Sequence, residues 1–175
     1  GGGLAYGSAV ACIVECNTAN SEGGGVNARN ADIVNSIINN NTCSSYGAGI
    51  NVVGSVTVTN CNIVNNSGYG FYNNGSGNVV YNTVIWGNKN NNASSNFYNN
   101  SGSISITYSA VEGGAAGVGN IQLASQNSGD GLHPMFVNPT QGVGTTYSGG
   151  DWHVMEGSAL VNAGASDIAL PENDL

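Results

Sequence analysis

The sequence has very few charged residues, and almost none of them is basic. Of its 175 residues, two are Lys or Arg and ten are Asp or Glu, so the formal net charge is −8. Charged residues make up 7% of the chain, against about 25% in an average protein. Because binding to nucleic acid phosphates needs clustered Lys and Arg, this balance argues against a nucleic acid partner.

Long hydrophobic runs are also missing. No stretch reaches the roughly 18 consecutive apolar residues that a membrane-spanning helix needs, so we expect no membrane span in this chain. The chain begins at Gly1, without an initiator methionine, and no basic segment followed by an apolar one marks a signal peptide. We therefore expect a fragment or a processed product of a longer protein.

Cysteine is scarce, and its spacing fits no zinc site. The cysteines are Cys12, Cys16, Cys43 and Cys61. Cys12 and Cys16 resemble half of a metal site, but no second Cys/His pair at ligand spacing follows. We expect buried thiols that replace Ser or Thr in a stack. A Cys16–Cys43 disulfide between neighbouring repeats and a metal or catalytic role are the alternatives.

What the sequence does contain is glycine, asparagine and a repeat. It has 28 Gly, and small residues precede an apolar one in openings such as Gly1-Gly2-Gly3-Leu4. Aligning these openings gives an apolar column with steps of 22, 24, 21, 26 and 24 residues: Leu4, Val26, Ile50, Phe71, Phe97 and Ile121. Self-similarity at a period of about 20 to 25 residues indicates a solenoid.

Two further apolar columns run at the same period. One consists of Val14, Ile38, Ile63, Ile85 and Val111, and the other of Ile33, Val58, Val80 and Ile106. Two positions beyond the second of these columns stand Asn35, Asn60 and Asn82. We interpret them as an asparagine ladder, in which inward side chains hydrogen-bond along their own stack.

The composition of each repeat favours β-strands over other solenoid units. Leu is scarce before residue 120, which argues against leucine-rich repeats, and no segment shows the 10 to 12 or so residues of helical periodicity that a helical unit needs. Val56-Thr57-Val58-Thr59 and Ile104-Ser105-Ile106-Thr107 alternate with period two, as half-buried strands do. We predict an all-β parallel β-helix over residues 1–121, with about five to six coils stacked about 4.8 Å apart.

This pattern resembles the secreted right-handed parallel β-helix proteins of bacteria, which have the pectate-lyase-like fold. Residues 82–88 (NTVIWGN) and 108–113 (YSAVEG) look like the final coils of large bacterial surface β-helix proteins. Residues 134–139, 151–154 and 157–164 are similar to that family's D-P-x-F-x-x-P, D-Y-x-L and G-S-P-A-I-D-A-G segments. The resemblance implies a right-handed solenoid on an extracellular or cell-surface protein.

The same resemblance bears on the end of the chain. His133, Ala159 and Asn162 depart from the family's usual Asp, Pro and Asp at these positions. We expect residues 122–175 to form a C-terminal capping segment of the same domain, because an uncovered last coil exposes unpaired strand edges and apolar columns.

Catalytic residues are not evident. Glycoside hydrolysis needs two carboxylates about 5 to 10 Å apart, and no column of the repeat places acidic residues in adjacent coils. The densest polar group is Asp151, His153 and Glu156, a candidate metal site, with a capped turn as the structural alternative. Ca²⁺ is conceivable at Asp167, Glu172 and Asp174, where a frayed end is the alternative.

Aromatic residues suggest a binding surface. Tyr69, Tyr72, Tyr81 and Tyr98 recur in neighbouring repeats, and Tyr72 and Tyr98 occupy equivalent positions. Sugar rings stack on aromatic faces while Asn side chains supply hydrogen bonds. We therefore name Tyr72, Tyr98 and Trp86 as a candidate glycan-binding strip, with packing under loops as the alternative.

These observations favour a non-catalytic extracellular or cell-surface scaffold with a role in adhesion or glycan binding. The alternative is a fragment of a polysaccharide lyase or hydrolase whose catalytic coils lie elsewhere. An ice-binding β-helix ranks third, since Thr57 and Thr59 have no equivalents one repeat away. The expected partner is a polysaccharide or a cell-surface glycan, and no cofactor other than Ca²⁺ is indicated.

Overall fold

The structure is a computed structural model that describes residues 1–126 and 128–165. Its described part contains strands and turns but no helix, and therefore no helix able to cross a membrane. Three parallel sheets form the body of the molecule, and successive coils of the chain add strands to them in turn. The fold class is thus the predicted parallel β-helix.

The strands of the three sheets have the following bounds. Sheet A consists of β1 (Leu4–Ala5), β5 (Val26–Ala28), β9 (Ile50–Val52), β12 (Phe71–Asn74) and β17 (Phe97–Ser101). Sheet B consists of β2 (Ala9–Val10), β6 (Ala31–Val34), β10 (Val56–Thr59), β13 (Asn78–Tyr81) and β18 (Ile104–Thr107). Sheet C consists of β3 (Ile13–Glu15), β7 (Ile37–Asn39), β11 (Asn62–Val64), β14 (Val84–Trp86), β19 (Ala110–Glu112) and β20 (Ile121–Leu123).

Three smaller pairs lie outside these sheets. A parallel pair is made of β4 (Thr18–Ala19) and β8 (Thr42–Cys43). Two antiparallel pairs are β15 (Lys89–Asn90) with β16 (Ala93–Ser94), and β21 (Phe136–Asn138) with β22 (Asp151–Val154).

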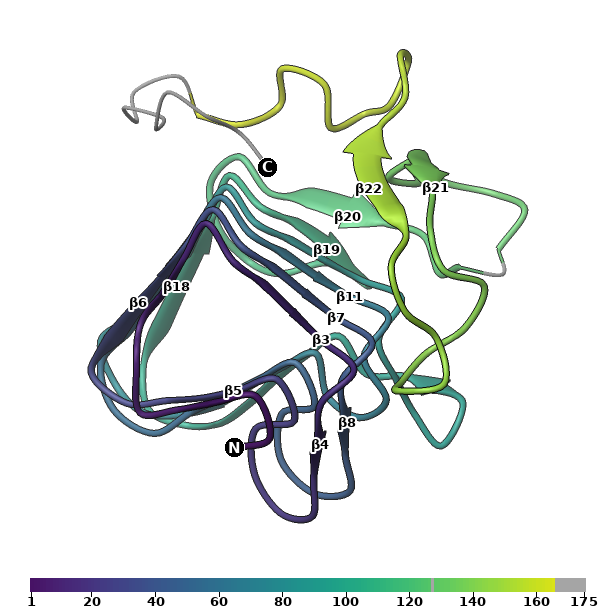
Figure 1. Cartoon of the computed structure of the whole chain (residues 1–175). Coiled ribbons are helices and arrows are strands. Elements are labelled where there is room, and N and C mark those ends of the chain that lie inside the picture. The colour runs from purple at the N-terminus through teal and green to yellow at the C-terminus, as the bar shows by residue number, and fades with distance from the viewer. Residues whose placement is uncertain (127, 166–175) are drawn as a thin grey trace.

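Seen along its axis, the solenoid is a triangular prism with one sheet on each side (Figure 1). The chain makes about four turns, slightly fewer than the five to six coils predicted. The turns are right-handed, as crossovers between parallel strands nearly always are.

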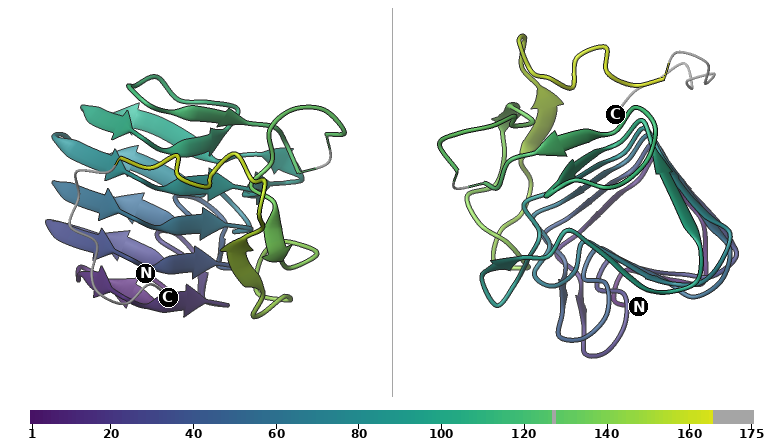
Figure 2. Two further views of the ribbon diagram at one scale, coloured as in Figure 1. Left: turned by 90° about the horizontal axis from the view of Figure 1, so that it is seen from above. Right: turned by 180° about the vertical axis from the view of Figure 1, so that it is seen from behind.

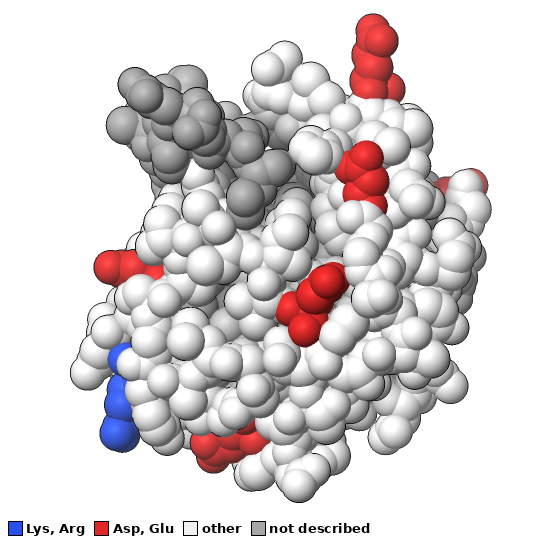
Figure 3. Space-filling view, in the orientation of Figure 1, with Lys and Arg blue, Asp and Glu red and all other residues white. Residues whose placement is uncertain are grey.

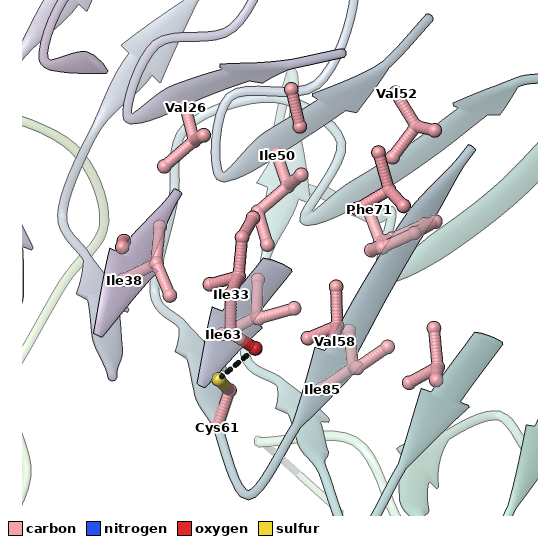
Figure 4. Close-up of a cluster of buried hydrophobic side chains, with 14 of the residues drawn as sticks. Val26, Ile33, Ile38, Ile50, Val52, Val58, Cys61, Ile63, Phe71 and Ile85 are labelled. Carbon is pink, nitrogen blue, oxygen red and sulfur yellow. Dashed lines mark hydrogen bonds between the residues drawn. The ribbon is translucent and has the colours of Figure 1, made fainter. Parts of the chain in front are cut away.

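Stacked aliphatic columns fill the prism. Ile63 pairs with Ile38 on one side and Ile85 on the other, and all three side chains are fully buried. The column of Ile33, Val58 and Val80 is confirmed in the same way. Figure 4 shows the side chains of Ile38, Ile63 and Ile85 and those of Ile33 and Val58 converging from neighbouring strands. Full burial of one such side chain contributes about 1.5 to 3 kcal/mol, and β-branched residues also suit strand geometry.

Each coil turns between sheets B and C at one residue with left-handed backbone conformation, which we call the first bend. These residues have φ between 46° and 55°: Ala11, Asn35, Asn60, Asn82 and Tyr108. The predicted asparagine ladder was assigned to this column, and that assignment is wrong. Asn35 Oδ1 and Asn60 Nδ2 are buried and have no hydrogen-bond partner in the described structure. Asn recurs here because it tolerates positive φ better than most residues.

The residue after each first bend closes the turn with a hydroxyl or thiol. Ser36, Thr83 and Ser109 donate their hydroxyl hydrogens to the carbonyl two residues earlier, at 2.8, 2.9 and 2.9 Å. Cys12 Sγ and Cys61 Sγ donate to the equivalent carbonyls at 3.1 and 3.2 Å. These two cysteines therefore replace Ser or Thr in a stack, as predicted. All four cysteines are free, so the alternative Cys16–Cys43 disulfide is absent.

A true asparagine ladder lies at the second bend, where each coil leaves sheet C, and it ends at Asn96, which directly precedes β17. Its members are Asn17, Asn41, Asn66, Asn88 and Asn96. Along the ladder each Nδ2 donates to Oδ1 of the next member, at 3.0, 3.0, 2.8 and 2.9 Å. The residue before each of the first four members has positive φ: Cys16, Asn40, Asn65 and Gly87.

The final coil is cut short. Residue Ile121 pairs with Ala110 in sheet C, so its assignment to the column of Leu4 and Phe97 is wrong. After β19, residues 113–119 (GGAAGVG) bypass sheets A and B and return the chain directly to the first bend. There Asn120 Oδ1 accepts a hydrogen bond from Ser109 N at 3.0 Å. This Gly/Ala-rich crossing packs Ala115 against the core at this end of the prism.

Residues 124–165, which we call the strap, do not cover that end. They run back along the outside of sheet C, as Figure 2 shows for β21 and β22. Gly149 N donates to Glu15 Oε2 in the first coil at 3.0 Å, and Ala165 N donates to Asn82 Oδ1 at 2.9 Å. The expected capping segment is therefore a lateral cover, and residues 166–175 lie outside the described part. Within the strap, Ser158 Oγ donates a hydrogen bond to Pro134 O at 2.7 Å.

Candidate functional site

The outer face of sheet A carries a polar and aromatic column. The parallel register aligns Asn27, Asn51, Tyr72 and Tyr98 in successive strands. Their neighbours on either side point into the core, because side chains alternate along a strand. Asn51 Nδ2 donates to Asn27 Oδ1 at 3.0 Å, so the first half of the column is bonded within itself.

Four rings gather over the second half of this column, and we call them the tyrosine cluster: Tyr46, Tyr69, Tyr72 and Tyr98. Tyr72 and Tyr98 stack at a centroid distance of 5.4 Å, which confirms that their positions are equivalent. Tyr46 lies 4.9 Å and Tyr69 5.5 Å from Tyr72. Tyr72 is buried beneath its neighbours, whereas Tyr46 and Tyr98 expose 45% and 44% of their surface. Burial, and to a lesser extent the adjacent tyrosines, raise the pKa of Tyr72.

A cavity of about 440 Å³ opens beside Tyr69 and Tyr98. Its remaining lining is mostly polar and consists of Ser94, Ser95, Asn96, Phe97, Glu112, Gly113 and Gly114. Glu112 is buried, and its carboxylate accepts hydrogen bonds from Gly87 N and Ser94 Oγ, both at 2.8 Å. These bonds hold the carboxylate in place on the wall of the cavity.

Trp86 lies away from the tyrosine cluster. It belongs to β14 in sheet C, where its ring packs 5.9 Å from Phe136 in the strap. Its Nε1 donates to Ala124 O at 3.0 Å, and the side chain is buried. Phe136 in turn packs 5.2 Å from Trp152. The structure thus brings together two of the three proposed glycan-binding residues and uses the third to anchor the strap.

The candidate metal residues are only partly brought together. His153 Nδ1 and Asp151 Oδ1 lie 2.6 Å apart, and His153 N donates to the same oxygen at 3.0 Å. The side-chain hydrogen bond, and then the backbone one, lower the pKa of Asp151. Within the described residues, no three His, Cys, Asp or Glu side chains are grouped to hold a metal ion, so Glu156 does not complete such a site. The Ca²⁺ candidates Asp167, Glu172 and Asp174 lie outside the described residues.

A larger hollow of about 830 Å³ separates the strap from the outer face of sheet C. Its floor includes the outward side chains Ile13, Ile37, Val84 and Ile121. Asp151 and His153 lie on the strap side. Figure 3 shows how sparse and scattered the charges are on this view of the molecule. The sequence offered no signal for this hollow, because the strap that forms its wall has no repeat.

Sequence reasoning also missed Tyr46, which is not in a strand. Its one signal is position: Tyr46 directly precedes the small-residue opening at Gly47, as Glu22 precedes Gly23. The structure pairs Glu22 with Tyr46 across neighbouring coils. The outward position that carries an acid in one coil therefore carries an aromatic ring in the next.

The tyrosine cluster and the adjacent cavity together are suited to binding a ligand. Exposed ring faces provide apolar contact, while the serine, asparagine and carboxylate groups of the adjacent cavity supply hydrogen bonds. No protein family model matches this chain, and neither a curated protein nor a solved structure shows significant similarity to it.

Proposed function

We propose that this chain is a non-catalytic, extracellular β-helix scaffold that binds a glycan on the tyrosine cluster. The proposal includes the likeness to secreted bacterial β-helix proteins noted from the repeat. One observation carries it: rings from neighbouring coils gather on an outer face, with Tyr46 and Tyr98 each nearly half exposed beside a polar cavity. A pyranose ring has the apolar face and surrounding hydroxyls that such a surface accepts.

The charge of the chain narrows the glycan class. With two basic residues against ten acidic ones, the molecule repels polyanions at neutral pH. We therefore favour a neutral polysaccharide over an acidic one. The hydrogen-bonding groups that line the cavity are uncharged except for Glu112, which suits the hydroxyl groups of neutral sugars.

Affinity electrophoresis tests this proposal. The protein is run in native gels containing galactomannan, mixed-linkage β-glucan or polygalacturonate. We expect at least one neutral polysaccharide to retard the protein and Tyr98→Ala to abolish the retardation. Tyr6→Ala serves as the matched control, because Tyr6 is 60% exposed but lies outside the cluster.

Two outcomes would contradict the proposal. One is the absence of retardation in both neutral gels, and the other is unchanged retardation of Tyr98→Ala. The alternative, a fragment of a polysaccharide lyase or hydrolase, is tested by incubating the same polysaccharides with the protein in solution. Release of shortened oligosaccharides would show that the protein is an enzyme and not a non-catalytic scaffold.

A further inference from the structure

Glu112 ends a chain of hydrogen bonds that begins in the asparagine ladder. Asn96, the last member of the ladder, donates from Nδ2 to Ser94 Oγ at 2.9 Å, and Ser94 donates its hydroxyl hydrogen to Glu112 Oε1 at 2.8 Å. Every ladder amide donates in the same direction, toward this carboxylate. The chain therefore ends on an acceptor, which is the role of a carboxylate when it is ionised.

This carboxylate is buried without a cationic partner. Glu112 exposes 7% of its surface, and the groups that donate to it, Gly87 N and Ser94 Oγ, are both neutral. Among the described residues the only ion pair joins His153 to Asp151. A buried charge is costly unless it is paired and hydrogen-bonded, and a carboxylate offers about four acceptor sites. An unpaired charge and spare acceptor capacity therefore remain on the wall of the cavity.

The cavity beside Glu112 supplies the other contacts that a cationic group needs. Tyr69 and Tyr98 line it together with the carboxylate, and a cation within about 6 Å of a tyrosine ring is attracted to the ring face. Gly113 and Gly114 leave part of the wall without side chains. Ligand pockets enclose about 300 to 1,000 Å³, so this cavity of about 440 Å³ admits a group of the size of one sugar ring.

The protein groups at hand decide which kind of cation fits. Ca²⁺ takes about six to eight oxygen ligands, and no three His, Cys, Asp or Glu side chains are grouped for a metal ion within the described residues. An organic ammonium group needs only one carboxylate and aromatic walls. Because the adjacent tyrosine cluster suits the faces of sugar rings, a sugar is the best carrier of this ammonium group. The net charge of −8 also attracts a cationic ligand.

We propose that Glu112 makes this site selective for glycans that contain an amino sugar with a free, protonated amino group, the rest of the glycan being neutral. The amino group enters the cavity and donates hydrogen bonds to the Glu112 carboxylate, while neighbouring sugar rings lie on the tyrosine cluster. This inference rests on the proposed function, because it assigns a class of glycan to the same site. Glu112 is then the residue that determines specificity, and the tyrosines supply the general affinity for sugars.

Calorimetric titration of the whole chain tests the proposal with a linear hexamer of glucosamine, its fully N-acetylated counterpart and hexalysine. The titrations are run at about pH 6, which keeps the amines protonated, and at about 0.15 M salt, which screens unspecific attraction. We expect the glucosamine hexamer to bind about tenfold more tightly than the acetylated one, as a hydrogen bond to a charged group implies. Hexalysine should bind at least about tenfold more weakly than the glucosamine hexamer, because it has no sugar ring to lie on the tyrosines.

Two variants separate the charge of Glu112 from its packing. In Glu112→Gln the amide oxygen can accept from Gly87 N and the amide nitrogen can donate to Ser94 Oγ, so both contacts are kept while the charge is lost. We expect this variant to bind the two sugar hexamers with equal affinity. Asp32→Asn is the matched control, because it removes one negative charge from an exposed residue outside the cavity and should keep the preference for the glucosamine hexamer.

Three results would overturn this proposal alone. Equal affinity of the wild-type protein for the two sugar hexamers is one, and it decides the matter even if Glu112→Gln fails to fold, while glycan binding itself would stand. An undiminished preference in folded Glu112→Gln is another. Hexalysine that binds as tightly as the glucosamine hexamer would assign the cavity to a basic peptide. Absence of binding to both sugar hexamers and to the neutral polysaccharide gels would contradict the proposed function, and this inference with it.

Discussion

The two bends of each coil solve the same backbone problem with different side chains. At both, a residue with positive φ turns the chain, and the next residue carries a hydrogen-bonding side chain that is buried in every coil after the first. At the first bend that residue is Ser, Thr or Cys, and at the second it is Asn. A shared conformation therefore does not require a shared residue type.

The bends differ in how many backbone groups one side chain satisfies. Thr83 accepts from Cys61 N at 3.3 Å and donates to Tyr81 O at 2.9 Å. Asn66 accepts from the backbone N–H and the side chain of Asn41, and it donates to Asn88 and to two backbone carbonyls. An amide carries both donors and an acceptor, so it links three coils. The second bend, which leads into longer and more variable loops, has the more extensive connections.

The largest expected effect is at the ladder. Asn66→Ala should lower the free energy of unfolding by about 4 kcal/mol, because several buried groups lose partners at about 1 to 3 kcal/mol each. Urea denaturation measures this change. Asn62→Ala is the control, since Asn62 points away from the core and should cost less than about 0.5 kcal/mol. Equal losses in the two variants would mean that the ladder is not a main source of stability.

A smaller effect is expected at the first bend. Thr83→Ala removes one donor and one acceptor and should cost about 1.5 kcal/mol, by the same denaturation measurement. Thr83→Ser keeps the hydroxyl and should recover most of that loss. If Thr83→Ala were as damaging as Asn66→Ala, the contrast drawn between the bends would be wrong.

Substitutions of the residues with positive φ should also distinguish the two bends, with a smaller difference in the free energy of unfolding. Asn65 at the second bend donates to Thr140 O and Oγ1 in the strap at 3.0 and 2.9 Å, whereas Asn60 Nδ2 at the first bend has no partner in the described structure. Glycine adopts positive φ freely, so Asn60→Gly should change the free energy of unfolding by less than about 0.5 kcal/mol. Asn65→Gly should cost about 1 kcal/mol for its lost bonds. Thermal melting of the pair checks the order, and a reversed order would contradict it.

The smallest effect at neutral pH should come from exchanging the thiol for a hydroxyl. Cys61→Ser keeps a donor to the same carbonyl and should shift the free energy of unfolding by less than about 1 kcal/mol. Burial raises the pKa of Cys61 from 9.0 to about 12. The folded state therefore holds this proton more tightly than the unfolded state, and stability should fall as pH rises above 9.0.

Alkylation and pH titration measure the role of Cys61 directly. At pH 8, iodoacetamide should leave Cys61 unmodified until the protein unfolds, because the thiolate is the reactive form. The loss of stability above pH 9 should be smaller in Cys61→Ser, which has no thiol to ionise there. Rapid modification of the folded protein at Cys61 would show that this bend opens.

The regular part of the fold was predictable because stacking repeats the same residue type at the same place. The columns containing Ile38, Ile63 and Val58 are confirmed for this reason. The ladder was assigned to Asn35, Asn60 and Asn82 because asparagine is favoured both at positive φ and in hydrogen-bonded stacks. Periodicity alone does not separate these two causes. Ile121 was misplaced because the chain bypasses two sheets and still reaches an apolar residue after a normal interval.

The candidate site was predictable only where it follows the repeat. Tyr72 and Tyr98 occupy one column, and the structure places them together. Trp86 faces outward in a different sheet, and its partner Phe136 comes from a strap that has no internal repeat. Contacts between the strap and the solenoid depend on single residues far apart in the chain, such as Asn65 and Thr140. No sequence pattern within the strap or within the solenoid predicts these contacts.

The strap also has a mechanical consequence. Solenoid coils that touch only their neighbours can peel away one at a time from either end. Here Cys16 Sγ in the first coil donates to Tyr147 O at 3.1 Å, and Trp86 Nε1 three coils further on donates to Ala124 O at 3.0 Å. Residues 124–147 thus connect the first coil to a coil near the other end of the solenoid, along its outside. Under tension applied between the two ends of the prism, the coils should resist together and give way in one rupture event instead of a series of small steps.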